Sequence, residues 1–245
     1  MKPARRRRGP IQLLDWLRER NPELSDPEGA IAAGSVRVDG VIRTNPATMV
    51  RPQATVVVTR SVPLRGEAKL RGALATFNLS VAGRVALDVG AAAGGFTKVL
   101  LEAGARRVYA VDAGHGQLLG SLRQHPRVVN LEATNVSQLT TELIPETIEV
   151  VTVDVSYLSL SAAVAQVNRV SLAPDADLVG LVKPMFELRL GAPPTEPALL
   201  AQALALATAG IERAGWEIAG TMPSPVQGAR GAIEMLVHAH RKPSF

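Results

Sequence analysis

The sequence predicts an α/β fold with a doubly wound parallel sheet, preceded by a smaller α+β domain. An apolar run at residues 85–89 ends at a glycine-rich loop, and a helical pattern follows that loop. Further apolar runs alternate with helical segments, which is typical of a parallel sheet with helices on both faces. The excess positive charge lies in the first quarter of the chain: residues 1–60 contain 11 Lys and Arg against 6 Asp and Glu, whereas the remaining 185 residues contain 16 of each.

The composition limits the class of protein. With 47% hydrophobic residues in 245, the chain can bury a sizeable core. The absence of cysteine excludes disulfides and thiolate metal sites, and the four histidines (His115, His125, His238 and His240) form no ligand pattern. No apolar run is long and uncharged enough to span a membrane, and the amino terminus lacks the apolar core of a signal peptide. We therefore expect a soluble, cytoplasmic protein with no membrane partner and no metal.

The first 60 residues predict a small RNA-binding domain. Lys2 and Arg5–Arg8 form a basic arm, for which a solvated tail and a phosphate-binding segment are equally open. Ile11, Leu14 and Leu17 have helical spacing, a second short helix is expected to open near residues 25–28, and a strand is expected at residues 55–58. Any small α+β domain fits this pattern, although the charge favours RNA binding.

This order resembles the alpha-L RNA-binding motif of ribosomal protein S-four. Residues 34–40 keep its Gly-x-Val-x-Val-x-Gly hairpin. The chain departs from the motif at residues 25–27, where Ser-Asp-Pro replaces the usual Ser-Arg at the start of the second helix. The departure bears on the details of RNA contact.

The large domain is expected to follow a linker at residues 61–66 and to occupy residues 67–245. Its five parallel strands are predicted at residues 85–89, 107–112, 127–131, 148–154 and 177–182. Helices are predicted at residues 67–79, 96–103, 117–123 and 197–214, and a final antiparallel pair of strands at residues 217–221 and 231–238.

The glycine-rich loop after residue 89 predicts a ligand site. Gly90, Gly94 and Gly95 allow a ligand close to the backbone, and the following helix amino terminus favours a negative group. The spacing departs from the Gly-x-Gly-x-x-Gly of dinucleotide sites, and Asp88 two residues before the first glycine favours S-adenosylmethionine (SAM). Asp112 ends the second strand and would accept hydrogen bonds from ribose hydroxyls of either SAM or NAD. These residues alone leave both cofactors open.

Charged residues end the fourth and fifth predicted strands. Asp154 and Lys183 each follow a strongly apolar run, so both should emerge at the carboxyl edge of the sheet, beside the loop. Glu234 lies within an apolar run that predicts a strand. Strands often end in solvated charges, so a functional cluster and an ordinary sheet edge are about equally favoured.

Five motifs, in order, resemble those of the TlyA family, which are ribosomal RNA 2′-O-methyltransferases also labelled hemolysins. They are Arg65-Gly66-x-x-Lys69-Leu70, Leu87-Asp88-x-Gly90-Ala91-x-x-Gly94-Gly95-Phe96-Thr97, Asp112-x-Gly114-x-Gly116-Gln117-Leu118, Asp154-x-Ser156-Tyr157-x-Ser159-Leu160 and Leu181-Val182-Lys183-Pro184-x-Phe186-Glu187. The resemblance covers nearly the whole chain. It implies a Rossmann-like SAM-dependent methyltransferase sheet similar to FtsJ/RrmJ behind an S-four-like domain, and a cytidine ribose in ribosomal RNA as the target.

The resemblance also implies residue roles. A catalytic Lys-Asp-Lys-Glu tetrad is implied at Lys69, Asp154, Lys183 and Glu234. Contacts with SAM are implied at Asp88, Gly90, Ala91, Gly94, Gly95, Phe96, Asp112, Asn135 and Asp154. A ribose 2′-hydroxyl is a poor nucleophile, so one lysine of lowered proton affinity would accept its proton while the carboxylates orient the group, without a metal.

Three departures from the family leave a second function open. Residues 188–194 replace a Gly- and Lys-rich loop, Ala232 replaces an Asn, and Ala93 replaces a Thr or Pro. A noncatalytic RNA-binding or ribosome-assembly factor with a degenerate methyltransferase domain would account for these changes. Membrane lysis, suggested only by the hemolysin label, is disfavoured because the chain has no cationic amphipathic helix.

Overall fold

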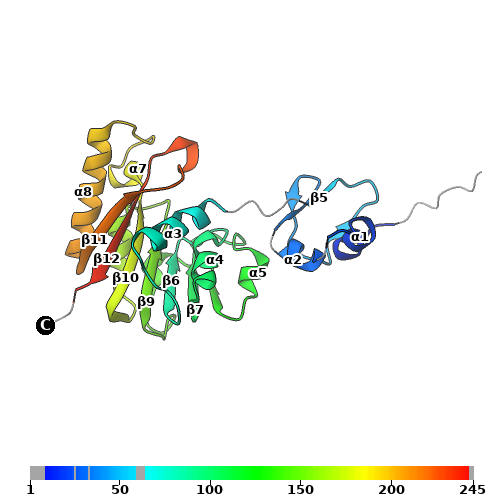
Figure 1. Cartoon of the computed structure of the whole chain (residues 1–245), viewed down its shortest axis with the longest axis horizontal. Helices are drawn as coiled ribbons and strands as arrows, with labels where there is room; N and C mark the ends of the chain where they lie inside the picture. Colours follow the sequence, from blue (N-terminus) through cyan, green and yellow to red (C-terminus); the bar gives the residue numbers. More distant parts are fainter. Residues whose placement is uncertain (1–8, 25, 33, 59–63, 243–245) are drawn as a thin grey trace, which may run out of the picture. The chain divides into compact units, whose positions relative to one another are not determined.

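The computed structural model describes residues 9–24, 26–32, 34–58 and 64–242, which cluster into two compact units (Figure 1). Unit 1 comprises residues 1–63 with 119–125, and unit 2 comprises residues 64–118 and 126–245. The basic arm at Lys2 and Arg5–Arg8 and part of the predicted linker lie outside the described residues. The domain bounds expected from the sequence stay predictions, as does RNA binding by the first domain.

Unit 1 has a small core between two helices and short strands. The helices are α1 (Leu13–Arg20) and α2 (Pro27–Ala32), and the three-stranded sheet has the order β3-β2-β5, formed by β3 (Val41–Ile42), β2 (Val36–Val38) and β5 (Val56–Val58). A separate pair joins β1 (Ile11–Gln12) to β4 (Met49–Val50). Leu13, Trp16, Leu17 and Ile31 are buried between these elements. Ile11, which the spacing assigned to the first helix, instead pairs with Val50 because the helix begins two residues later.

Unit 2 contains a seven-stranded sheet of order β11-β12-β10-β9-β6-β7-β8. Its strands are β6 (Val85–Val89), β7 (Arg107–Val111), β8 (Val128–Leu131), β9 (Ile148–Val153), β10 (Leu172–Val182), β11 (Trp216–Pro223) and β12 (Met235–Arg241). Five strands run parallel from β8 to β10, and β12 is antiparallel to both of its neighbours. The predicted α/β class with a terminal antiparallel pair is confirmed.

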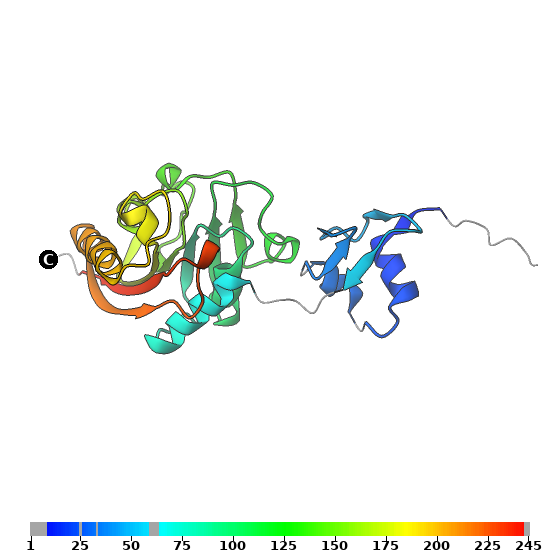
Figure 2. The ribbon, with the colours of Figure 1, turned by 90° about the horizontal axis from the view of Figure 1, so that it is seen from above.

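Helices cover both faces of this sheet. The longer ones are α3 (Arg65–Thr76), α4 (Gly95–Glu102), α6 (Leu160–Val167) and α8 (Pro197–Arg213), and α7 (Pro184–Glu187) is a single turn. Another single turn, α5 (Gly120–Arg123), clusters with unit 1. Helix α3 packs beside α4, and α6 packs beside α8. Figure 2 shows α3 and α8 on opposite sides of the sheet. Among the described residues, no helix combines the length and the apolar character that a membrane span requires.

Two predicted helices have other bounds in the structure: α3 runs from Arg65 to Thr76 rather than over 67–79, so it begins inside the predicted linker, and α5 covers only Gly120–Arg123 of 117–123. Three further differences have local causes. Helix α6 was not predicted, although Leu160, Ala163, Val164 and Val167 are buried at helical spacing and Ser159 caps the amino end. Strand β10 begins five residues early because it continues past an irregularity in its pairing with β9. Strand β12 begins late, since the 3-10 turn η2 (Ala229–Gly231) precedes it, so Glu234 lies just before the strand rather than within it.

Candidate active site

Two lysines and two carboxylates meet at the carboxyl edge of the sheet. Lys69 Nζ donates to Glu234 Oε2 at 2.6 Å and lies 3.9 Å from Asp154 Oδ2. Lys183 Nζ lies 2.6 Å from Asp154 Oδ1 and donates to Ser156 Oγ at 2.7 Å. Asp154 therefore joins two ion pairs into one cluster in which the formal charges balance. The four residues that the sequence assigned to a tetrad are all in this cluster.

Four different elements bring these side chains together. Asp154 follows β9, and its backbone N–H extends the sheet pairing to Val89 O at 2.9 Å. Lys183 follows β10 and precedes Pro184, which opens α7. Lys69 lies on the second turn of α3, and Glu234 ends the turn before β12. Because β9 and β10 are parallel neighbours, the residues after them emerge at the same edge.

The turn before β12 holds Glu234 tightly. Gly228 N–H donates to Ala232 O at 2.8 Å, and Ser224 N–H donates to Glu234 O at 2.9 Å. A Cβ at Gly228 would lie 2.3 Å from Glu234 Oε1, so a larger residue would displace the carboxylate. Gly228 was not among the residues singled out in the sequence, and its only local signal is the glycine-rich composition of this turn.

A cavity of about 390 Å³ opens onto this cluster. Its walls include Lys69, Ser156, Lys183 and Glu234, together with two exposed arginines, Arg65 and Arg230. The side chains of Lys69 and Glu234 are 7% and 5% exposed, whereas those of Asp154 and Lys183 are 19% and 13% exposed. The Asp154–Lys183 side is thus the more accessible to a substrate. Ala232 and Pro193, from two segments that depart from the family pattern, also line the cavity.

The glycine loop lies directly beside Asp154. Gly90 has φ +89°, and a Cβ there would lie 2.3 Å from the backbone oxygen of Asp154. Only glycine therefore allows the two strand ends to approach this closely. Gly94, also at positive φ, precedes the first turn of α4, and Ala91 is buried.

Asp88 is fully buried beneath this arrangement. Its two oxygens accept hydrogen bonds from Thr97 Oγ1 at 2.6 Å and Thr152 Oγ1 at 2.8 Å. Burial raises the pKa of Asp88 to about 6, the two threonine hydrogen bonds lower it, and the charge of Asp154 raises it. In the structure this carboxylate holds β6, β9 and α4 together. Direct contact of Asp88 with a cofactor stays a prediction.

Gly95 and Phe96 pack against another helix. A Cβ at Gly95 would lie 3.0 Å from Gly66 Cα, and a Cβ at Gly66 would lie 3.2 Å from Phe96 Cδ1. The amino ends of α3 and α4 are therefore in close contact, which fixes the helix that carries Lys69. Glu67, which sequence reasoning missed, strengthens this contact by accepting a hydrogen bond from Lys98 at 2.9 Å.

Asp112 has the geometry expected of a ribose-binding carboxylate. Its oxygens accept hydrogen bonds from Ala92 N–H at 2.9 Å and Gly114 N–H at 2.6 Å. Each carboxylate oxygen has a further lone pair, so two ribose hydroxyls could still be accepted. The two backbone bonds hold the carboxylate between the glycine loop and the segment after β7.

Asn135 and Tyr157 are close to the same region. At the start of η1 (Val136–Gln138), Asn135 Oδ1 accepts hydrogen bonds from both the backbone N–H and the Oγ of Ser137, each at 3.0 Å. Both lone pairs of this oxygen are thus used, and the amide NH₂ is left for a ligand. Burial raises the pKa of the Tyr157 phenol, while a hydrogen bond with the backbone of Val136 lowers it. Tyr157 was not singled out as a site residue, although its place in the Asp154 motif was a signal.

Glu187 supports the segment after Lys183. Its Oε1 accepts the backbone N–H of Leu160 at 2.5 Å and so caps α6. Burial raises the pKa of Glu187, and the hydrogen bond from Leu160 lowers it. The Phe-Glu motif thus ties α7, which follows Lys183, to a neighbouring helix.

Comparison with known proteins gives the family. The FtsJ-like methyltransferase model matches residues 63–241. The 16S/23S rRNA (cytidine-2′-O)-methyltransferase TlyA of Mycobacterium tuberculosis is 42% identical over 213 residues, which are 83% of this chain and 79% of that protein. A hemolysin-named protein of Streptococcus thermophilus has a solved structure with a TM-score of 0.70 and 29% identity, covering 96% of this chain and 90% of that one.

A more distant structure shares only the fold. The S-adenosylmethionine dependent methyltransferase of Mesorhizobium loti has a TM-score of 0.53 and 16% identity, covering 73% of this chain and 100% of that one. The family match confirms the resemblance that the motifs indicated, from the first helix of unit 2 to its last strand. The chain belongs to the FtsJ-like methyltransferase family and, within it, to the TlyA family.

Proposed function

We propose that this protein transfers a methyl group from SAM to the 2′-hydroxyl of a cytidine ribose in ribosomal RNA. The proposal rests on two ion pairs, Lys69–Glu234 and Lys183–Asp154. They form one cluster in the wall of a cavity beside the glycine loop. The name of the Mycobacterium tuberculosis relative states this reaction, which supports the choice of substrate. The complete tetrad disfavours a noncatalytic assembly factor.

The residues present fit SAM. The adenosine part of SAM would bind against Gly90 and Asp112. A side chain at Gly90 would collide with the Asp154 backbone, and two backbone N–H groups hold the Asp112 carboxylate. When bound, SAM supplies a methyl group already activated by its sulfonium. Ala91, Gly94, Gly95, Phe96 and Asn135 are proposed to shape this site, and Asp88 to support it from below.

The side chains of this chain would then align the hydroxyl and manage its proton. Lys183 and Asp154 are the more exposed pair, so the ribose is proposed to bind against them. Asp154 would accept a hydrogen bond from the 2′-hydroxyl. Lys183 would first release its own proton to solvent through the cavity, and its neutral amine would then receive the hydroxyl proton as the oxygen is methylated. Lys69 and Glu234, which are more deeply buried, would hold Asp154 in position. Alignment of this kind accounts for a large part of such a rate enhancement.

Substitution of Lys183 tests the proposal most directly. In Lys183→Ala we expect unchanged folding and SAM affinity but a single-turnover rate lower by about 10²–10⁴-fold, the usual value of a positioned general base. Mapping of ribose methylation in ribosomal RNA incubated with each protein would show the product and its position. Normal methylation by Lys183→Ala would contradict the proposed site.

Lys183→Arg separates two roles of the same residue. A guanidinium stays protonated and cannot accept the proton, so we expect Lys183→Arg to be as slow as Lys183→Ala. A near-normal rate would assign Lys183 to orientation or charge stabilisation instead. Lys69 is a poorer test position, because its removal leaves Glu234 buried without its cation and endangers the fold.

A further inference from the structure

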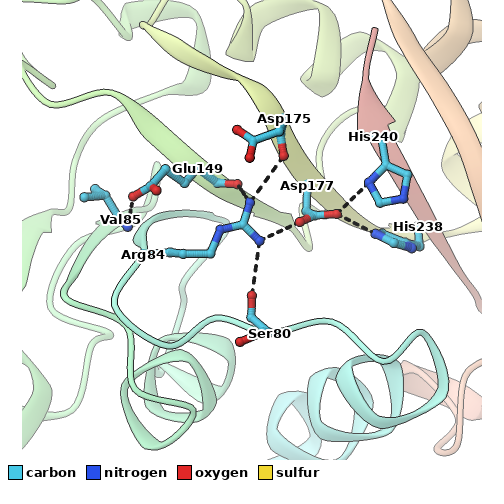
Figure 3. A network of polar contacts seen from close by, with 8 residues as sticks. All are labelled: Ser80, Arg84, Val85, Glu149, Asp175, Asp177, His238 and His240. Atoms are coloured by element: carbon cyan, nitrogen blue, oxygen red, sulfur yellow. Dashed lines mark hydrogen bonds and ion pairs between the residues drawn. The ribbon is translucent and has the colours of Figure 1, made fainter. Parts of the chain in front are cut away.

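A second cluster lies in unit 2, away from the proposed active site. Asp177, on β10, lies five residues before Val182, roughly 17 Å along the strand from the edge that carries Lys183. It is directly opposite His240 in the pairing of β10 with β12, and diagonal to His238. Since alternate residues of a strand share a face, the His-x-His sequence turns both imidazoles toward Asp177 (Figure 3).

The ligand atoms of this cluster converge on one point. His238 Nε2 and His240 Nδ1 each lie 2.8 Å from the same oxygen, Asp177 Oδ1, and all three atoms lie within 4.8 Å of one another. The other oxygen, Oδ2, is paired with Arg84 at 2.5 Å. Arg84 therefore fixes the carboxylate while leaving Oδ1 toward the two histidines. Phe77 stacks on the His238 ring at 5.2 Å, which limits its rotation.

Two neutral histidines could donate hydrogen bonds to one oxygen, so convergence alone does not require a ligand. The surroundings add a second observation. The cluster lines a cavity of about 470 Å³ whose described walls also include Glu149, Asp175 and Arg84. Arg84 pairs with the carboxylate of Asp177 but contacts Glu149 and Asp175 only through their backbone oxygens. The residues lining the cavity thus carry three carboxylates and one guanidinium, a charge balance that favours a cation. His240 is 53% exposed, so an ion could enter from solvent.

We propose that Asp177, His238 and His240 bind a divalent transition metal ion of the Zn²⁺ type. Two imidazole nitrogens and one carboxylate oxygen suit Zn²⁺, whereas Ca²⁺ and Mg²⁺ prefer oxygen ligands alone. With bonds of about 2.0–2.1 Å, tetrahedral ligand atoms lie roughly 3.3 Å apart, so the present 2.8 Å separations need to open by only about 0.5 Å. A water facing the cavity would complete four ligands.

The ion would link β10 to β12 and would take no part in methyl transfer, because it lies at a distance from the cavity that contains Lys183. Its expected effect is on the stability of this part of the sheet. The sequence did not suggest the site: the four histidines show no metal-ligand spacing, and only the antiparallel pairing brings Asp177 to His-x-His.

Zinc binding to the full-length, tag-free protein tests the proposal. Competition with a chromophoric chelator should give one Zn²⁺ per chain with micromolar or tighter affinity, and Co²⁺ should give the visible absorption of a tetrahedral site. His240→Ala, at an exposed position, should bind at least tenfold more weakly and lose the rise in melting temperature that Zn²⁺ gives the natural chain. His115→Ala, which changes an exposed histidine elsewhere in unit 2, should bind normally.

Two results would overturn the proposal. One is the absence of Zn²⁺ binding at about 100 μM by the natural chain. The other is equal binding by His240→Ala and the natural chain, which would mean adventitious surface binding. His240→Gln provides a second variant of similar polarity, so a folding defect in His240→Ala, detected by circular dichroism, would not obscure the outcome.

Discussion

Asp112 is the side chain on which recognition of the cofactor adenosine depends most directly. Its carboxylate is held by Ala92 and Gly114 and is partly open to ligand. We expect Asp112→Ala to weaken SAM binding by at least tenfold, since two ribose hydroxyls lose their acceptor. Calorimetry with SAM and with NAD measures this effect, and the natural chain should bind SAM but not NAD. Comparable affinities for SAM and NAD, or unchanged SAM binding by Asp112→Ala, would refute the assignment.

The raised pKa of Asp88 predicts how the stability of the folded chain changes with pH. Its pKa in the folded chain is about 6 against an ordinary value of 3.8, because burial disfavours the charged form. Between these pH values the folded chain keeps a proton that the unfolded chain has released. Stability contributed by this group therefore falls as pH rises through the window and levels off above about pH 6.

Asp88→Asn removes this titration. Relative to the natural chain, the variant should gain on the order of 2–3 kcal/mol of unfolding free energy between about pH 4 and pH 7, according to the size of the pKa shift. Urea unfolding at several pH values measures the difference. Glu142→Gln, at an exposed position, is the control and should follow the natural chain. Parallel pH profiles for Asp88→Asn and the natural chain would show that Asp88 does not titrate in this range.

The turn from β6 into the glycine loop is constrained by a close contact between two backbone segments. Gly90 and Gly83 both have positive φ, at +89° and +76°, but only Gly90 has a close neighbour, the Asp154 backbone oxygen at 2.3 Å from a Cβ. Comparison of the two positions separates backbone strain from the collision between strand ends. Gly83→Ala should cost about 1–2 kcal/mol of stability, the strain of a left-handed residue.

Gly90→Ala should cost more than Gly83→Ala and should also slow methyl transfer, because the backbone of Asp154 must move. Urea unfolding and single-turnover methylation of both variants provide the measurements. If Gly90→Ala has the stability of Gly83→Ala and a normal rate, the contact between the loop and Asp154 has no functional consequence.

The contact between α3 and α4 shows how one element positions another. Gly66 and Gly95 allow the amino ends of the two helices to touch, and Glu67 joins them through Lys98. Lys69 follows on the same helix, so its place in the cluster depends on this contact. The close packing of α3 against α4 thus explains why Gly66 and Gly95, which belong to two different motifs, are both glycine.

The distribution of charge along the chain predicts that RNA binding and SAM binding reside in different domains. The net charge of +5 is concentrated in residues 1–60, while the rest of the chain is balanced. Deletion of residues 1–60 should abolish tight RNA binding and leave SAM binding intact, since unit 2 has its own core. Filter binding and calorimetry on the truncated chain measure the two activities. Undiminished RNA affinity would contradict the assignment of the first domain.

Salt gives an independent check on the same proposal. If several phosphates are neutralised by Lys and Arg, the logarithm of the RNA affinity should fall linearly with the logarithm of salt concentration, with a slope of about −0.7 per phosphate for single strands. The truncated chain should show a shallower slope than the full chain. Equal slopes would mean that the first 60 residues contribute no phosphate contacts.

Most local elements and the residue types of the site could be predicted from the amino-acid sequence. Alternating apolar runs and helical patterns placed the five parallel strands, and Asp154 and Lys183 stood out because each follows such a run. Elements of this kind are encoded by periodicity over a few residues, so they can be recognised without the fold. The segment of helix α6 has the same kind of signal, in the helical spacing of its apolar residues and in its Ser159 cap.

The family resemblance grouped the four tetrad residues, but the contacts that bring distant side chains together follow from the arrangement of the strands. Lys69 and Glu234 are 165 residues apart and pair at 2.6 Å because β12 lies between β10 and β11, an order that periodicity does not reveal. The same insertion brings Asp177 to His238 and His240. Contacts across a sheet depend on strand order, direction and register, and these are set by the packing of the whole domain.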